Sequence, residues 1–171
     1  TAHEAIYQRL DDDRWFVIRN LLTILKMQKD PVDLERIKHL QDFPHLRVNQ
    51  EYLQLLFKLD RKQASALLSK QLQSNDPQLR MHAVQLAEQS DDPAASQQLL
   101  KMLAADKLTD ETLPQKQQII RSLCGIGAEN AFPTLQRLLK PGLLFTSKRR
   151  LELQKEIVRN LNKFPAPMVS P

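Results

Sequence analysis

Glycine, cysteine and aromatic residues are all scarce in this sequence. It contains three glycines in 171 residues, and 5% of its residues are aromatic. Sheet proteins need β-branched and aromatic runs separated by frequent glycine turns, and the sequence shows neither pattern. The abundant Leu, Gln, Lys, Ala and Glu favour helices, because these side chains lose little conformational freedom in a helix. The predicted fold class is all-α.

The single cysteine, Cys124, excludes an internal disulfide framework and favours a reduced, intracellular setting. It follows the apolar residues Ile119, Ile120 and Leu123, so we expect a buried structural thiol and not a nucleophile. No apolar run approaches the ~20 residues of a membrane span. The sequence also has no signal-peptide pattern. These features predict a cytoplasmic protein without a membrane span.

The residue types of common catalytic and metal sites are present without the required spacing. The four histidines are His3, His39, His45 and His82. His3 and Glu4 form the only His–Glu pair, and His39 and His45 lie six residues apart across the break at Phe43 and Pro44, with no nearby Cys to complete a metal site. No glycine-flanked nucleophile or phosphate-binding glycine loop occurs either. The acidic runs 11–13 and 91–92 precede expected helices, where carboxylates cap free N–H groups. We therefore predict no enzyme activity, no metal and no cofactor.

The net charge is modestly positive. There are 25 Lys and Arg against 20 Asp and Glu, which gives +5. Such an excess permits binding to nucleic acid or to an acidic protein, but it is also common on soluble surfaces. Most charges are interspersed, and the dense basic run is Lys148, Arg149 and Arg150, which forms the candidate basic patch.

Helical periodicity recurs along the chain, interrupted by short breaks that contain Asp or Pro. The clearest helix begins at Asp76 and Pro77, a capping residue followed by a first-turn proline. Another break at residues 90–93 precedes a helix predicted over 94–104. Similar patterns predict helices in the stretches 1–10, 30–40, 46–57, 64–72, 119–126, 131–139 and 151–161.

A basic residue tends to recur early in the second helix of each predicted pair, at Arg19, Arg47, Arg80 and Lys116. A period near 30 that contains two helices predicts stacked repeats, because each pair exposes an apolar side until its neighbour covers it. We expect the repeated arginines to pair with an Asp of the adjoining repeat. Trp15, at the start of an apolar helix, is expected to pack in the core.

Three stretches resemble HEAT repeats, particularly the short bacterial phycobilisome-lyase type. Residues 76–86 (DPQLRMHAVQL) and 13–21 (DRWFVIRNL) resemble second helices, and 123–135 (LCGIGAENAFPTL) resembles the turn between repeats. The resemblance implies a right-handed α-solenoid, an alpha-alpha superhelix of about five HEAT-like helix pairs, over residues 1–164. Residues 165–171 are expected to form a Pro-rich linker or tail. Repeats of this type do not in themselves imply bilin attachment.

The resemblance implies a protein–protein interaction module, a scaffold or regulatory part of a bacterial-type protein. Its partner would be another protein or another domain of the parent chain. Second helices usually line the concave side of such solenoids. The register of Arg80 then predicts a stripe of partner-binding residues: Leu21, Ile24, Asn49, Tyr52, His82, Gln85, Gln118 and Arg121.

Several alternatives remain open at this stage. Nucleic-acid binding through a basic surface is the alternative function. Leu21 and Ile24 could instead pack against a neighbouring element. The apolar segment 143–145 beside the basic run could dock on an acidic partner or a membrane, although a loop folded onto the last repeat is the favoured interpretation.

Overall fold

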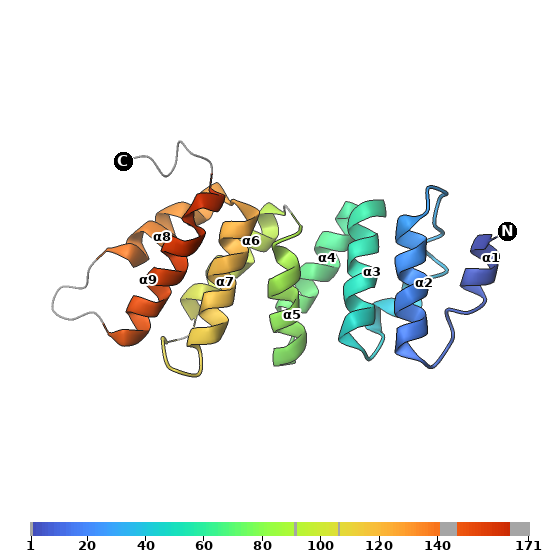
Figure 1. Cartoon of the computed structure of the whole chain (residues 1–171), viewed down its shortest axis with the longest axis horizontal. Coiled ribbons are helices and arrows are strands. Elements are labelled where there is room, and N and C mark those ends of the chain that lie inside the picture. Colours follow the sequence, from blue (N-terminus) through green and yellow to red (C-terminus); the bar gives the residue numbers. More distant parts are fainter. Residues whose placement is uncertain (1, 91, 106, 141–146, 165–171) are drawn as a thin grey trace. The chain divides into compact units, whose positions relative to one another are not determined.

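A computed structural model describes residues 2–90, 92–105, 107–140 and 147–164, and all of its regular structure is helical (Figure 1). The α-helices are α1 (Ala2–Tyr7), α2 (Trp15–Met27), α3 (Leu46–Leu59), α4 (Arg61–Leu72), α5 (Pro77–Ala87), α6 (Pro93–Ala105), α7 (Leu113–Ile126), α8 (Phe132–Leu139) and α9 (Lys148–Asn160). Three short 3₁₀ helices are η1 (Lys38–Asp42), η2 (Glu129–Ala131) and η3 (Leu161–Lys163). No strand occurs in these ranges, so the all-α prediction is confirmed.

The chain divides into two compact units. Unit 1 comprises Thr1–Leu67, and unit 2 begins at Leu68, so the boundary falls within α4. The predicted tail 165–171 and the apolar segment 143–145 lie outside the described residues.

Side-chain caps explain where several helices begin. At the start of α5, Asp76 Oδ1 accepts hydrogen bonds from the backbone N–H groups of Gln78 (2.8 Å) and Leu79 (3.4 Å). Asp92 Oδ1 accepts in the same way from Ala94 at the start of α6 (2.9 Å). These carboxylates satisfy donors that the first turn leaves without a partner, as the sequence predicts. Asp91, predicted to act with Asp92, lies outside the described residues.

The acidic run before α2 does not cap that helix. Asp12 Oδ1 accepts from the backbone N–H of Arg14 (2.9 Å), and its second oxygen pairs with the Arg14 guanidinium (2.7 Å). Arg14 itself is the N-cap residue, and no side chain caps the helix there. The Asp12 carboxylate was expected to cap the first turn of α2, but it is paired with the exposed Arg14 guanidinium instead.

In unit 1, α2 and α3 lie side by side and run in the same direction (Figure 1). At their N-terminal ends the Trp15 ring stacks on His45, with 4.0 Å between ring centroids. At their C-terminal ends Lys58 Nζ donates to the carbonyl of Lys26 (2.6 Å). The core between them contains Ile18, Leu22 and Leu25 of α2 and Val48, Leu53, Leu55 and Leu56 of α3. Trp15 is only half-buried at the edge of this core.

The helix predicted over 30–40 is wrong. The structure has turns there, followed by η1, although Ile37 and Leu40 are buried as core residues. Asp33 gives the reason: its backbone N–H donates to Tyr7 Oη (2.8 Å), and its Oδ1 accepts from the Glu35 N–H (3.1 Å). A short polar side chain that binds nearby backbone offers the chain an alternative to the helix.

In unit 2, α7 packs against α5, α6 and α9. Its residues Ile119, Ile120, Leu123 and Cys124 are all buried. The Ser122 hydroxyl donates to the Val84 carbonyl of α5 (2.7 Å). The helix ends at Gly127, whose φ of 64° is the left-handed conformation that glycine adopts without strain. The predicted break at this glycine is confirmed.

Candidate functional site

The predicted stripe of partner-binding residues is exposed only in part in unit 1. On α2, Ile24 is 44% exposed, and Leu21 is half-buried. On α3, Asn49 and Tyr52 are 8% and 2% exposed, so the prediction that they face solvent is wrong. The Asn49 amide donates to the Phe43 carbonyl (3.1 Å).

A register error explains this outcome. Helices α3 and α5 begin at Leu46 and Pro77, 31 residues apart. Asn49 is therefore equivalent to Arg80, whereas the prediction equated Arg47 with Arg80. A shift of two residues rotates a helix by about 160° from the intended face, which turned buried positions of α3 into expected surface positions.

The predicted residues of unit 2 form hydrogen bonds and ion pairs within the unit. Arg121 donates to Gln118 Oε1 (2.9 Å) and pairs with the buried Glu156 of α9 (3.4 Å between Nη1 and Oε1). Glu156 Oε1 also accepts from the Asn160 amide (3.0 Å). Gln118 and Arg121 thus help to join α7 to α9.

On α5, Gln85 is exposed as predicted, and His82 is half-buried. His82 Nε2 is buried without a hydrogen-bond partner among the described residues. Burial lowers the pKa of this imidazole, because it disfavours the charged form. His82 therefore contributes mainly apolar packing and little charge to this face.

The recurring basic residues bind backbone and aromatic groups. Arg80 Nη1 donates to the Ser74 carbonyl (2.7 Å), and Lys116 Nζ donates to the Leu103 carbonyl (2.6 Å). The Arg47 guanidinium lies 5.5 Å from the centroid of the Trp15 ring. The expected partner of Arg80 was an Asp of the adjoining repeat; its described partner is a carbonyl just before its own helix.

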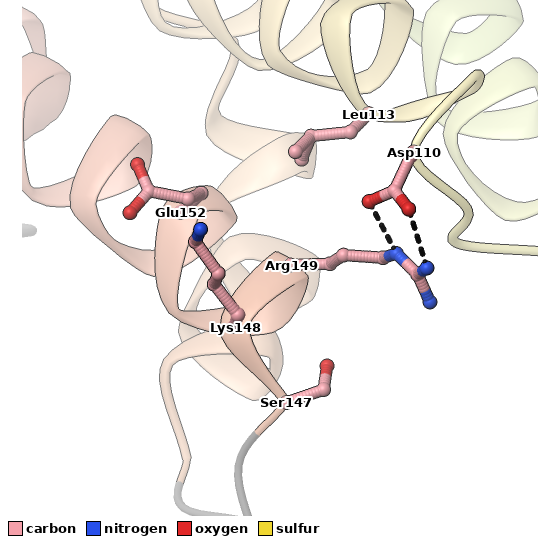
Figure 2. A pocket seen from close by; sticks show the side chains of 6 residues that line it. All are labelled: Asp110, Leu113, Ser147, Lys148, Arg149 and Glu152. Carbon is pink, nitrogen blue, oxygen red and sulfur yellow. Dashed lines mark hydrogen bonds and ion pairs between the residues drawn. The ribbon is translucent and has the colours of Figure 1, made fainter.

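The candidate basic patch borders a pocket of about 530 Å³ in unit 2 (Figure 2). Arg149 forms two short bonds to Asp110, Nε to Oδ1 at 2.7 Å and Nη2 to Oδ2 at 2.6 Å. This guanidinium lowers the pKa of Asp110, and the carboxylate raises that of Arg149. Arg150 Nη2 donates to the Lys140 carbonyl (2.9 Å). One of the three cations, Arg149, is therefore paired with a carboxylate, and Lys148 is exposed.

Unit 1 exposes an apolar row that the sequence analysis did not identify in full. Phe16, Ile24 and Met27 are 45%, 44% and 78% exposed, and they lie on the side of α2 opposite its buried residues. We call these three residues the α2 stripe. The signal was available in the sequence, because the apolar positions 16, 24 and 27 fall on one helical face, with the polar Asn20 between Phe16 and Ile24. Only Ile24 was assigned to the predicted surface.

Neither a reactive cysteine nor a metal-binding cluster occurs in the part of the chain that the structure describes. Cys124 is fully buried, and burial raises the pKa of its thiol to about 12, so the reactive thiolate is disfavoured. No group of three or more His, Cys, Asp or Glu side chains that could hold a metal ion occurs among the described residues. No helix in the described ranges is long and apolar enough to cross a membrane.

Comparisons of the sequence with family models and with curated proteins identify no relative. No family model matches the chain, and no curated protein matches it significantly. The resemblance to HEAT repeats therefore rests on the stretches 13–21, 76–86 and 123–135 and stays a prediction.

Proposed function

We propose that this chain is a protein–protein interaction module and that unit 1 binds its partner through the α2 stripe. The observation that carries the proposal is the exposure of Phe16, Ile24 and Met27 on one face of α2. Single exposed apolar residues are common, but apolar side chains gathered on one face mark interaction surfaces. Covering such side chains with a partner is favourable, because it removes apolar area from water.

The proposal includes HEAT-like helix pairs arranged as a right-handed α-solenoid, with no catalysis. Regular spacing supports it: α2, α3 and α5 begin at Trp15, Leu46 and Pro77, at intervals of 31 residues. The later helices α7 and α9 begin at Leu113 and Lys148, at longer intervals. The partner is another protein or another domain of the parent chain.

Nucleic-acid binding has less support as a function. A phosphate-binding surface needs cations that can release counterions when they meet phosphate. In the basic patch, the charge of Arg149 is compensated by Asp110. The patch therefore offers fewer available cations than its sequence indicates.

The proposal is tested by selecting peptides from a random displayed library on the whole immobilised chain. We expect the selected peptides to bind the wild type and to lose binding to the Met27→Glu variant. The matched control is Val158→Glu on α9, which places the same charge at another exposed apolar position. Circular dichroism establishes that both variants keep their helices. Peptides that bind Met27→Glu and Ile24→Glu as well as wild type, or no enrichment over an unrelated helical protein, contradict the proposal.

A further inference from the structure

A row of cations on α3 runs beside the α2 stripe. Arg47 and Lys58 are both exposed and are eleven residues apart, as are Phe16 and Met27 on α2. Eleven residues correspond to three helical turns, so each pair lies on one helical face and spans roughly 16 Å. Because α2 and α3 are adjacent and run in the same direction, the apolar and cationic rows lie alongside each other.

Each cation lies next to one end of the stripe. The Arg47 guanidinium lies 5.5 Å from the centroid of the Trp15 ring, and that ring packs edge-on against Phe16 at 6.0 Å. Lys58 Nζ donates to the carbonyls of Lys26 (2.6 Å) and Gln28 (3.3 Å), the residues on either side of Met27. A segment that covered the stripe would therefore meet a positive charge near both ends.

These two cations are not neutralised within the unit. Helices α2 and α3 together carry Arg19, Lys26, Arg47 and Lys58 against one carboxylate, Glu51. Glu51 is already engaged by Lys26 at 2.6 Å. No carboxylate among the described residues forms an ion pair with Arg47 or Lys58. Asp13 before α2 and Asp60 after α3 flank this face in the sequence but form no ion pair with Arg47 or Lys58, so both cations are available to an external anion.

We infer that the partner segment is an acidic amphipathic helix of about three turns. This inference rests on the proposed function and specifies the chemistry of its partner. Apolar side chains of the segment cover Phe16, Ile24 and Met27, and carboxylates along one edge reach Arg47 and Lys58. An amphipathic helix presents apolar groups at i, i+3, i+4 and i+7, a repeat that fits a stripe of this length. The opposite charges set its orientation and speed its association.

Fluorescein-labelled synthetic peptides of 14 residues test this inference by anisotropy with the whole chain. One peptide has leucines at helical spacing and glutamates along both edges, a second has lysines in place of the glutamates, and a third has serines in place of the leucines. We expect the Glu/Leu peptide to bind at least ~10-fold more tightly than the Lys/Leu peptide, and the Glu/Ser peptide not to bind. The fluorescence of Trp15, the sole tryptophan, gives a second measure of peptide binding, because its ring packs against Phe16 of the stripe.

A charge-reversed pair of variants distinguishes this surface from the general charge of the protein. The Arg47→Glu/Lys58→Glu variant should reverse the preference, so that the Lys/Leu peptide binds more tightly. The control Lys101→Glu/Lys107→Glu changes the net charge by the same amount at exposed positions of unit 2 and should keep the wild-type preference. Helix content by circular dichroism confirms that both variants fold.

The outcomes separate the two proposals. If both Leu peptides bind equally and both are lost in Met27→Glu, the acidic partner is overturned and the proposed function stands. If neither Met27→Glu nor the charge reversal changes the affinity for any peptide, both the proposed function and the acidic partner are overturned. An acidic preference that survives in Arg47→Glu/Lys58→Glu, or absence of binding by every peptide, also overturns the inference. Self-association in sedimentation that Met27→Glu abolishes would assign the stripe to a second copy of the chain.

Discussion

The cations that border the candidate surface of each unit differ in what they contact. In unit 1, Arg47 and Lys58 lie against an aromatic ring and backbone carbonyls and form no ion pair with a described carboxylate. In unit 2, Arg121 and Arg149 each pair with a carboxylate. The dense basic run of the sequence is in unit 2, yet the available cations that border an apolar surface are in unit 1. Charge counted along a sequence therefore does not locate a binding surface, because local ion pairs decide which charges remain available.

The apolar surfaces of the units differ as well. Unit 2 exposes Leu151 and Val158 on α9, but Lys155 stands between them on the same face and pairs with Glu152 (2.9 Å). The α2 stripe has no charged residue between Phe16 and Met27 on its face. A partner can cover the α2 stripe without desolvating a charge, and this makes unit 1 the better candidate for binding.

The largest expected effects come from truncating the core of each unit. Leu22→Ala in unit 1 and Ile119→Ala in unit 2 remove fully buried side chains. Each should lower the free energy of unfolding by about 3 kcal/mol, from lost burial and the cavity left behind. The chain has one tryptophan, in unit 1, and one cysteine, in unit 2. Denaturant titrations followed by Trp15 fluorescence and by Cys124 labelling therefore report on each unit separately.

We expect Leu22→Ala to shift the fluorescence transition more than the labelling transition, and Ile119→Ala to do the reverse. Met27→Ala, at an exposed position, is the control and should change the free energy by less than about 0.5 kcal/mol. Equal shifts of both probes in both variants would show that the two units unfold together. The units would then differ in their surfaces but not in their stability.

The buried thiol gives unit 2 a distinctive dependence on pH. Burial raises the pKa of Cys124 from 9.0 to about 12. The neutral thiol is therefore favoured in the folded state, so its contribution is fully present below pH 9 and is lost as the pH rises toward 12. Between pH 8 and 10 the free energy of unfolding should fall by on the order of 1 kcal/mol more in wild type than in Cys124→Ala. Identical pH slopes in urea titrations of the two proteins would contradict a buried neutral thiol.

Gly125 marks a close approach of two helices in unit 2. A Cβ at this position would clash with Cγ of Glu88, the residue that pairs with Lys163 (2.9 Å). Alanine favours a helix over glycine by about 1 kcal/mol, but displacing Glu88 should outweigh this gain and leave Gly125→Ala about 1 kcal/mol less stable. The double variant Gly125→Ala/Glu88→Ala should recover stability in thermal unfolding. A Gly125→Ala variant more stable than wild type would show that Glu88 moves aside at little cost.

The sequence predicted local features well. Helix starts at Asp76 and Asp92, the break at Gly127 and the burial of Cys124 each depend on a few neighbouring residues, and the structure confirms them. The segment 30–40 was mispredicted because its backbone binds Tyr7, which lies more than twenty residues earlier. Hydrophobic spacing cannot reveal such a contact between separate elements.

The candidate surface was predicted less well, for a different physical reason. Arg47 and Arg80 share a residue type, but their places in α3 and α5 differ, and a small error in register exchanges buried and exposed faces. Tyr52 shows the consequence, because its amphipathic side chain suits either a core or a surface. The exposure of the α2 stripe depends on which side of α2 has no neighbouring helix. The packing of the helices decides this, and the sequence of α2 alone does not.

The smallest expected effect sharpens the comparison of surface cations. Asp110→Asn breaks the exposed ion pair with Arg149, and such pairs contribute little, so the thermal midpoint should stay unchanged. The same change makes the Arg149 guanidinium available beside Lys148. Anisotropy of labelled oligonucleotides in a salt series should detect no binding by wild type at low salt and none by Asp110→Asn, because two cations on one helix end do not form a phosphate-binding surface. If the Asp110→Asn variant instead bound the oligonucleotides, with an affinity that fell steeply as salt increased, Asp110 would be masking a nucleic-acid site. Unit 2 would then be the better candidate for binding.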